Sequence, residues 1–160
     1  MNYNQWNNLL GWATFAVALG TYILTVEPTA SYWDCSEYIA TSAKLQVGHP
    51  PGAPFFQMVG AVFAGLAPTV EHIALAVNMM SVLASAFTIL FLFWTITRLS
   101  KRLLDPKNQG NHNAEIFVAA AVGALGFAFS DSFWFNAVEA EVYAMATCIL
   151  AVLFWLGLRW

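Results

Sequence analysis

Charged residues are scarce in this sequence, and their scarcity excludes most kinds of soluble protein. Only 9% of the 160 residues are charged and 59% are hydrophobic, whereas soluble domains carry about 25% charged residues. So few polar groups cannot cover a surface that faces water, and lipid should therefore surround much of the chain. The formal net charge of −3 leaves no basic surface, and we expect no nucleic-acid partner.

Cysteines and recognisable ligand motifs are equally sparse. The two cysteines, Cys35 and Cys148, make no disulfide framework and are expected to be unrelated buried thiols. The sequence contains no Walker loop, no Rossmann glycine pattern, no Cys/His metal spacing and no nucleophile elbow. From motifs alone we therefore assign no metal ligand.

Long apolar stretches predict an all-α integral membrane protein. A transmembrane helix needs about 20 apolar residues, and four stretches approach that length. The third is the weakest, because its apolar run 116–129 has 14 residues and also suits a buried or re-entrant segment; continued to Phe135 it would reach 20. The expected spans are residues 9–26, 73–97, 114–130 and 142–158.

The positions of lysine and arginine predict the orientation of these spans. Cytoplasmic loops carry an excess of these residues. The rule places loop 98–113 in the cytoplasm, together with the N-terminus, and it places segments 27–72 and 130–141 on the outward side. Five of the six basic residues lie at the predicted cytoplasmic side: Arg98, Lys101, Arg102, Lys107 and Arg159.

One further apolar stretch, residues 53–67, would reverse this orientation if it crossed the membrane. It is only 15 residues long and Pro68 follows it directly. We therefore expect an interfacial or half-buried helix within the outward loop 27–72.

Two carboxylates stand at the start of a helical pattern in the outward loop. Asp34 and Glu37 are three residues apart, just before and in the first turn of a helix predicted over residues 36–46. They would share one face if both were helical. The same spacing is typical of a capping box, which only starts a helix. Ionisable groups close to a membrane are costly and are functional candidates by default, so both interpretations stay open.

A rigid turn follows, and it contains the outward histidine. Residues 48–54 hold three prolines and two glycines, which predict a non-helical connection with Pro54 in the first turn of the next helix. The turn either holds His49 near Asp34 over the membrane surface or is a stiff connector with an incidental histidine.

A second acidic pair precedes the last span. Glu139 and Glu141 would point to different faces of a helix, so at least one should face the protein interior or water. The alternative is a pair of interfacial carboxylates at the end of a span.

Several of these segments resemble a bacterial membrane family allied to the protein O-mannosyltransferases, within the GT-C glycosyltransferase superfamily. The resemblance rests on Trp33-Asp34-x-x-Glu37 with the Lys-Leu-Gln-Val-Gly-His-Pro-Pro-Gly-Ala-Pro run of residues 44–54, and on residues 132–135 and 137–144. It implies a GT-C-like fold with four transmembrane helices and an outward first loop that carries juxtamembrane helices. Residues 1–160 would be the N-terminal part of that domain, in a bacterial inner (cytoplasmic) membrane, with the active side periplasmic.

The resemblance also implies a reaction. Such enzymes transfer a sugar, here mannose or a similar one, from a polyprenyl-phosphate donor to an acceptor hydroxyl of a protein or glycan. Asp34 matches the catalytic carboxylate, with Glu37 as its helper. No cofactor is implied beyond the lipid-linked sugar donor, and a divalent metal stays open without a motif. The remaining site residues implied are substrate-binding: His49, Lys44, Tyr38 and Glu141.

Two other classes of protein fit parts of the sequence. A non-catalytic subunit of a membrane assembly would keep its function when Asp34 is replaced. Part of a transporter would carry its carboxylates at mid-membrane depth around a pore, whereas the acids here gather towards one surface.

Overall fold

The computed structural model describes residues 2–104 and 112–160, and every regular element in these ranges is a helix. The expectation of an all-α chain is confirmed there. The elements in order are α1 (Tyr3–Thr25), α2 (Cys35–Lys44), α3 (Pro54–Leu66), η1 (Val70–His72), α4 (Ile73–Leu103), α5 (Asn113–Ala128), α6 (Asp131–Ala137) and α7 (Val142–Arg159).

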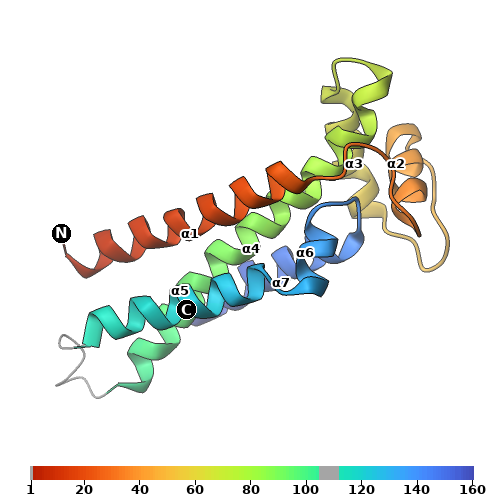
Figure 1. Cartoon of the computed structure of the whole chain (residues 1–160). Coiled ribbons are helices and arrows are strands. Elements are labelled where there is room, and N and C mark those ends of the chain that lie inside the picture. The colour runs from red at the N-terminus through yellow and green to blue at the C-terminus, as the bar shows by residue number, and fades with distance from the viewer. Residues whose placement is uncertain (1, 105–111) are drawn as a thin grey trace.

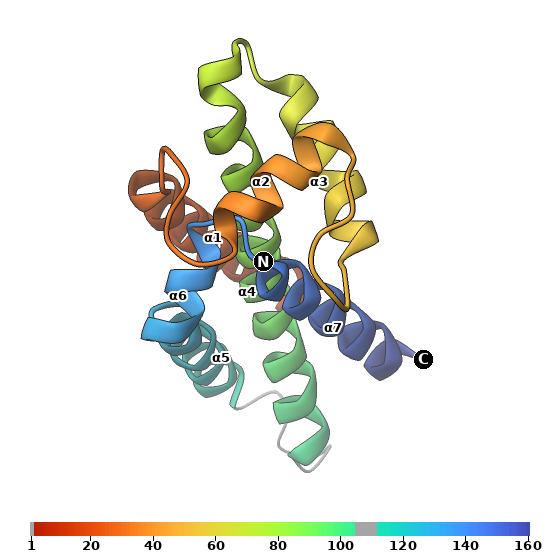
Figure 2. The same cartoon turned by 90° about the vertical axis from the view of Figure 1, so that its right-hand side faces the viewer.

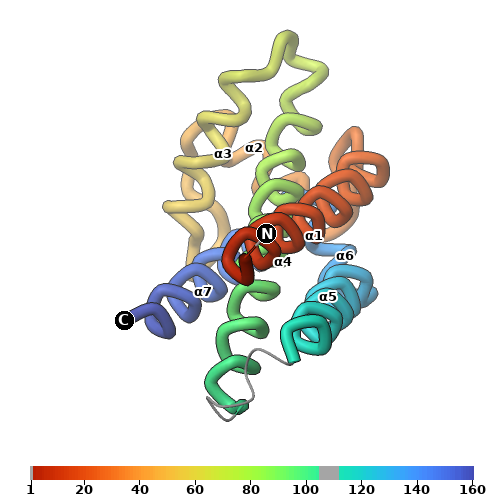
Figure 3. The backbone as a smooth tube through the Cα atoms, turned by 90° about the vertical axis from the view of Figure 1, so that its left-hand side faces the viewer, coloured from red at the N-terminus to blue at the C-terminus, as the bar shows by residue number. Residues whose placement is uncertain are grey.

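Helix α4 is the centre of the bundle, and α1, α5 and α7 pack around it (Figure 1). α1 and α5 run antiparallel to α4, whereas α7 runs parallel to it (Figure 1). Figure 3 looks along the bundle and shows α1, α5 and α7 around α4. One end of the bundle, the basic end, carries Arg98, Lys101, Arg102 and Arg159. The other end, the acidic end, carries α2, α3 and α6 with the carboxylates considered below.

Three helices are long and apolar enough to cross a membrane: α1, the continuous Val70–Leu103 unit that contains α4, and α7. Helices α5 and α6 meet at a bend of 68° and would make a fourth crossing only if the pair counts as one broken span. The third predicted span therefore ends near Ala128, and the extension to Phe135 does not continue it straight. By length and composition the chain is a multi-pass membrane protein.

Two helices extend beyond the spans predicted for them. α1 begins at Tyr3 rather than residue 9, because Asn2 and Gln5 form a capping box there. α4 continues to Leu103 rather than ending at residue 97, so Arg98 lies on the helix and not in a loop. Basic residues are favourable in the last turn of a helix. The apolar run ends before these residues, so run length alone did not predict that the helix continues through them. Residues 105–111 of the predicted cytoplasmic loop lie outside the described residues.

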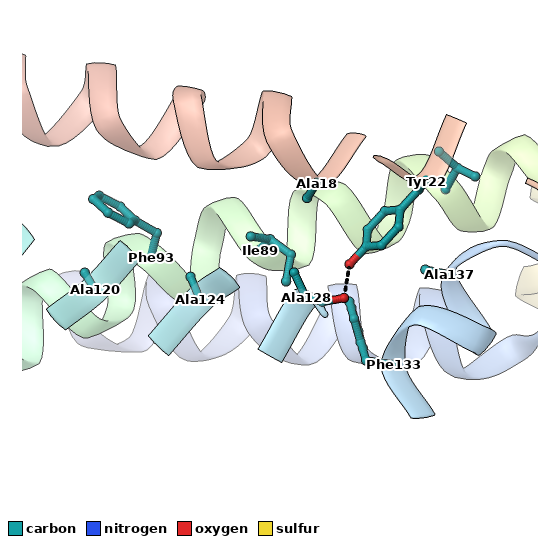
Figure 4. Packing of buried hydrophobic residues seen from close by; sticks show 10 residues of the cluster. Ala18, Tyr22, Ile89, Phe93, Ala120, Ala124, Ala128, Phe133 and Ala137 are labelled. Carbon is teal, nitrogen blue, oxygen red and sulfur yellow. Dashed lines mark hydrogen bonds between the residues drawn. The ribbon is translucent and has the colours of Figure 1, made fainter. Parts of the chain in front are cut away.

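Small residues let α5 approach α1 and α4 closely. Ala120, Ala124 and Ala128 recur every four residues and are fully buried (Figure 4). Such a stripe of small side chains brings helix backbones together within a membrane. Tyr22 of α1 adds a hydrogen bond to this packing, because its hydroxyl donates to the Ala128 carbonyl oxygen at 2.9 Å (Figure 4).

A second core forms where α2 and α3 cover the first turns of α4 (Figure 2). α3 has 13 residues, too few to cross a membrane, and Pro54 occupies its first turn as expected. Gly60 of α3 faces α2 so closely that an added Cβ would lie 2.8 Å from the Ser42 Cβ. The stretch 53–67 is therefore a short helix packed at the acidic end, as expected, and its position at the membrane interface stays a prediction.

The side chain of Asn78 joins the segment between α1 and α2 to α4. Its side chain is fully buried and donates to the carbonyl oxygens of Glu27 and Thr29, at 2.7 and 2.9 Å. Its Oδ1 lies 3.7 Å from the Cys35 Sγ. The segment between α1 and α2 is thus fixed to α4 by one polar side chain.

Replacing Asn78 with leucine is expected to lower the free energy of unfolding by about 2 kcal/mol, because two carbonyl oxygens lose their donor in a poorly hydrated place. The measurement is reversible unfolding of the purified protein in mixed micelles. Ser81→Ala is the matched control on α4, since its buried hydroxyl has no hydrogen-bond partner among the described residues. Equal losses in the two variants would contradict this role for Asn78.

Candidate active site

Three side chains with acid–base chemistry meet beside the start of α2. The His49 Nδ1 lies 3.0 Å from the Glu37 Oε2, and its Nε2 lies 3.9 Å from the Asp34 Oδ2. We call Asp34, Glu37 and His49 the acid–histidine cluster. The structure therefore brings together the two acids and the histidine that sequence placed on separate segments.

Asp34 is presented to solvent and is not used to start its helix. It occupies the N-cap position of α2, yet its side chain makes no capping hydrogen bond. The capping-box interpretation of Asp34 and Glu37 is therefore wrong. The Asp34 side chain is 54% exposed, beside Trp33, whose φ of 65° turns the chain into α2. An uncommitted, accessible carboxylate can receive a proton from a substrate.

Glu37 holds the proline-rich turn in place through His49. Its Oε1 accepts the His49 backbone N–H at 2.6 Å, while its Oε2 contacts the ring. Gly48 permits the approach, since an added Cβ would lie 3.0 Å from the Glu37 carboxylate, and Gly52 turns the chain with a φ of 80°. The hydrogen bonds from His49 lower the pKa of Glu37, and the same contact raises the pKa of His49. The pair is thus biased towards imidazolium and carboxylate.

Glu141 lies behind this cluster with its carboxylate buried. It immediately precedes α7 and is only 7% exposed. Burial, followed by the charges of Glu139 and Asp34, raises its pKa to about 7. Tyr38 packs beside the cluster: its ring centroid is 6.0 Å from that of His49, and burial with the charge of Glu141 raises its pKa. Glu141 is therefore an acid that changes charge near neutral pH beside Asp34.

Glu139 lies two residues before Glu141 and is held by a hydrogen bond. Its carboxylate accepts a short hydrogen bond from the Ser31 hydroxyl, and burial raises its pKa. The premise that Glu139 and Glu141 share a helix is wrong, because α6 ends at Ala137 and α7 begins at Val142. Both are buried, which meets the expectation that at least one would face inward.

Lys44 is the one predicted site residue that lies apart. It ends α2, two helical turns beyond Glu37 and so about 10 Å along the helix axis. Across residues 2–104 and 112–160, no carboxylate lies within ion-pair distance of it.

Sequence reasoning did not assign two residues that shape the site, Ser31 and Asn78. Asn78 had a usable signal, since a polar residue inside an apolar run generally faces a polar partner. Ser31 had none, because nothing in its neighbourhood predicts contact with Glu139.

The acid–histidine cluster also has the donor set for a cation. Each member offers one ligand atom, and these atoms lie within 4.8 Å of one another. Two carboxylate oxygens and one imidazole suit a divalent ion of the magnesium, manganese or zinc kind. The spacing of positions 34, 37 and 49 matches no metal motif, so a sequence scan does not find it.

Residues 34–160 match the family described as "Protein O-mannosyl-transferase TMEM260 N-terminal domain". The chain belongs to this family. The match covers every residue of the cluster together with Glu141, and the predicted kinship with protein O-mannosyltransferases is confirmed.

Two curated relatives share the name of that family. "Protein O-mannosyl-transferase TMEM260" of Mus musculus is 29% identical over 147 residues, which are 92% of this chain and 19% of the relative. "Protein O-mannosyl-transferase tmem260" of Dictyostelium discoideum is 26% identical over 137 residues, 85% of this chain and 15% of the relative. The chain thus spans less than a fifth of the length of each. Both organisms are eukaryotes, so a bacterial family and a bacterial inner membrane stay predictions. No solved structure matches.

Proposed function

We propose that this chain is the N-terminal, catalytic-site-bearing part of a GT-C-type protein O-mannosyltransferase. It transfers mannose from a polyprenyl-phosphate donor to a serine or threonine hydroxyl on the outward face of the membrane. The observation that carries the proposal is the acid–histidine cluster, which is accessible and backed by the buried Glu141 at one end of the bundle. A transporter would instead place its carboxylates along a central pore, and these lie at one end.

Asp34 acts as the general base in this proposal. The acceptor hydroxyl oxygen forms a bond to the anomeric carbon, the bond from that carbon to the phosphate oxygen breaks, and the hydroxyl proton moves to Asp34. A base within hydrogen-bond reach assists such a transfer. The carboxylate also stabilises the positive charge that develops on the sugar ring. The lipid phosphate departs with the electron pair of the broken bond.

His49 and its neighbours receive the donor phosphate. Glu37 favours the protonated ring of His49, and an imidazolium attracts the phosphate whose negative charge grows as the bond breaks. Tyr38 packs beside the ring and orients it. Lys44, at the end of α2, is the basic residue nearest to the cluster along that helix. It binds a part of the donor farther from the reacting bond.

Transfer is expected to rise about three- to tenfold as pH increases through about 7, because Glu141 then becomes ionised and a like charge nearby makes Asp34 a stronger base. The sign follows from a pKa raised above the usual value, which keeps Glu141 neutral at pH 6. Glu141→Gln should remove this step and stay near the low-pH rate. Initial rates between pH 5.5 and 8 test it.

Glu71→Gln is the control for the pH profile, because Glu71 is an exposed acid at the same end of the bundle. The control should keep the wild-type profile. If the rise in rate through pH 7 persists in Glu141→Gln, a group other than Glu141 causes it.

The proposed function itself is tested with the full-length protein in isolated membranes. Labelled mannose is supplied either on a polyprenyl phosphate or as a soluble nucleotide sugar, and label on outward-facing acceptor proteins is measured. Transfer from the lipid-linked donor alone is the expected result. Transfer from the nucleotide sugar without a lipid intermediate, or none from either donor while the protein is folded, would overturn it and favour a non-catalytic subunit.

A further inference from the structure

A pocket of about 750 Å³ opens at the basic end, between α1, α4 and α7. It is far from the acid–histidine cluster, since α4 separates the two ends. One wall is formed by asparagines in the first two turns of α1, and another by Trp94 and Trp155, whose ring centroids are 5.6 Å apart. The proposed transfer reaction assigns no role to this pocket.

Three arginines give the pocket a positive charge. Arg98 and Arg102 both donate to the carbonyl oxygen of Leu158, at 2.7 and 2.6 Å, so two guanidinium groups converge on one point. Arg159 lies over the Trp155 ring, 4.8 Å from its centroid. Within residues 2–104 and 112–160, none of the three forms an ion pair with a carboxylate, and no acid lines the pocket.

The arrangement suits an anion that carries an apolar body. A guanidinium has five N–H donors and the bond to Leu158 uses one, so further donors remain for phosphate oxygens. Tryptophans at a span end lie at the level of lipid headgroups. Asn7 lines the pocket, and its Oδ1 is buried without a hydrogen-bond partner among the described residues, where it can accept from a headgroup hydroxyl. A small free anion would leave the aromatic wall and Asn7 unused.

We propose that this pocket binds the headgroup of an anionic phospholipid, of the phosphatidylglycerol kind, in the leaflet at the basic end. The phosphodiester contacts Arg98 and Arg102, and the glycerol hydroxyls reach Asn7. Basic pockets between membrane helices are suited to such headgroups. The bound lipid joins the ends of α1, α4 and α7.

The test uses the delipidated full-length protein in a neutral detergent, titrated with phosphatidylglycerol or phosphatidylcholine and followed by native mass spectrometry. Wild type should retain phosphatidylglycerol preferentially. Arg98→Gln with Arg102→Gln should weaken that affinity roughly 10- to 30-fold, and Arg102→Gln alone roughly fivefold. The single variant changes an exposed side chain and guards against misfolding of the double variant. Glu71→Gln changes an exposed charge at the other end, outside both sites, and should not alter lipid retention.

Four results would overturn the proposal. Equal retention of the two lipids, or retention that ignores both arginine variants, would show that the headgroup is not recognised here. Displacement of the lipid by millimolar inorganic phosphate would indicate a site for a free anion. Absence of any lipid adduct would mean that another part of the polypeptide fills the pocket.

Discussion

Asp34→Asn in the full-length protein is expected to lower mannosyl transfer roughly 10²- to 10⁴-fold, the usual contribution of a general base. The amide keeps the size of the carboxylate but cannot accept the hydroxyl proton. The fold should survive, because the side chain is half exposed and makes no capping hydrogen bond. The measurement is the initial rate of transfer from polyprenyl-phosphate mannose at matched protein levels in membranes.

Asp131→Asn is the matched control. Asp131 is an exposed aspartate in the first turn of α6 at the same end of the bundle, and it lies outside the cluster. Its variant should transfer at the wild-type rate. Full activity of Asp34→Asn would remove Asp34 as the base, and Glu37 would then be the next carboxylate to test.

Glu37→Gln is expected to lower transfer about 10- to 100-fold, since a misplaced group close to the chemistry has effects of this order. Glu37 is the residue that fixes both the backbone and the ring of His49. Its loss frees the turn and also removes the contact that raises the pKa of His49. The imidazolium is then lost at a lower pH, so the rate at pH 8 should fall more than the rate at pH 6.

The pH dependence separates this role from a purely structural one. A variant that only loosened the fold would lose the same fraction of activity at every pH. Glu71→Gln serves again as the exposed-acid control. A uniform loss across the pH range in Glu37→Gln would show that Glu37 does not act through the charge of His49.

The lengths of the apolar runs predicted where the long helices lie. They did not predict where α1 begins or where α4 ends. The last span was placed within one residue of α7, because the apolar run begins directly after Glu141 and ends at Arg159. The ends of α1 and α4 were missed, since asparagine, arginine and lysine continue those helices by capping and by favourable charge at a helix terminus. A hydropathy profile reports neither helix capping nor the effect of charge at a helix terminus.

The candidate site was predictable where local chemistry defines it. The proline-rich turn limits where His49 can go, and its meeting with Asp34 was one of the two alternatives left open by the sequence. The burial of Glu139 and Glu141 was only partly foreseen, because the connection between α6 and α7 was taken as helical. The contact of Ser31 with Glu139 joins segments 108 positions apart, and no local pattern specifies such a pair.

The backbone hydrogen bond from the Glu27 N–H to the Val138 carbonyl oxygen, 2.9 Å long, sets the depth of the site. The apolar part of α1, residues 9–25, is about 25 Å long at 1.5 Å per residue, close to the roughly 30 Å of a bilayer's hydrocarbon layer. We therefore expect Glu27 at the water boundary, and the bond holds the segment with Glu139 and Glu141 at the same height. A sugar carried on a lipid phosphate travels within this same plane, whereas a protein acceptor descends from the water. In the proposed reaction, both therefore reach Asp34 without either one leaving its own medium.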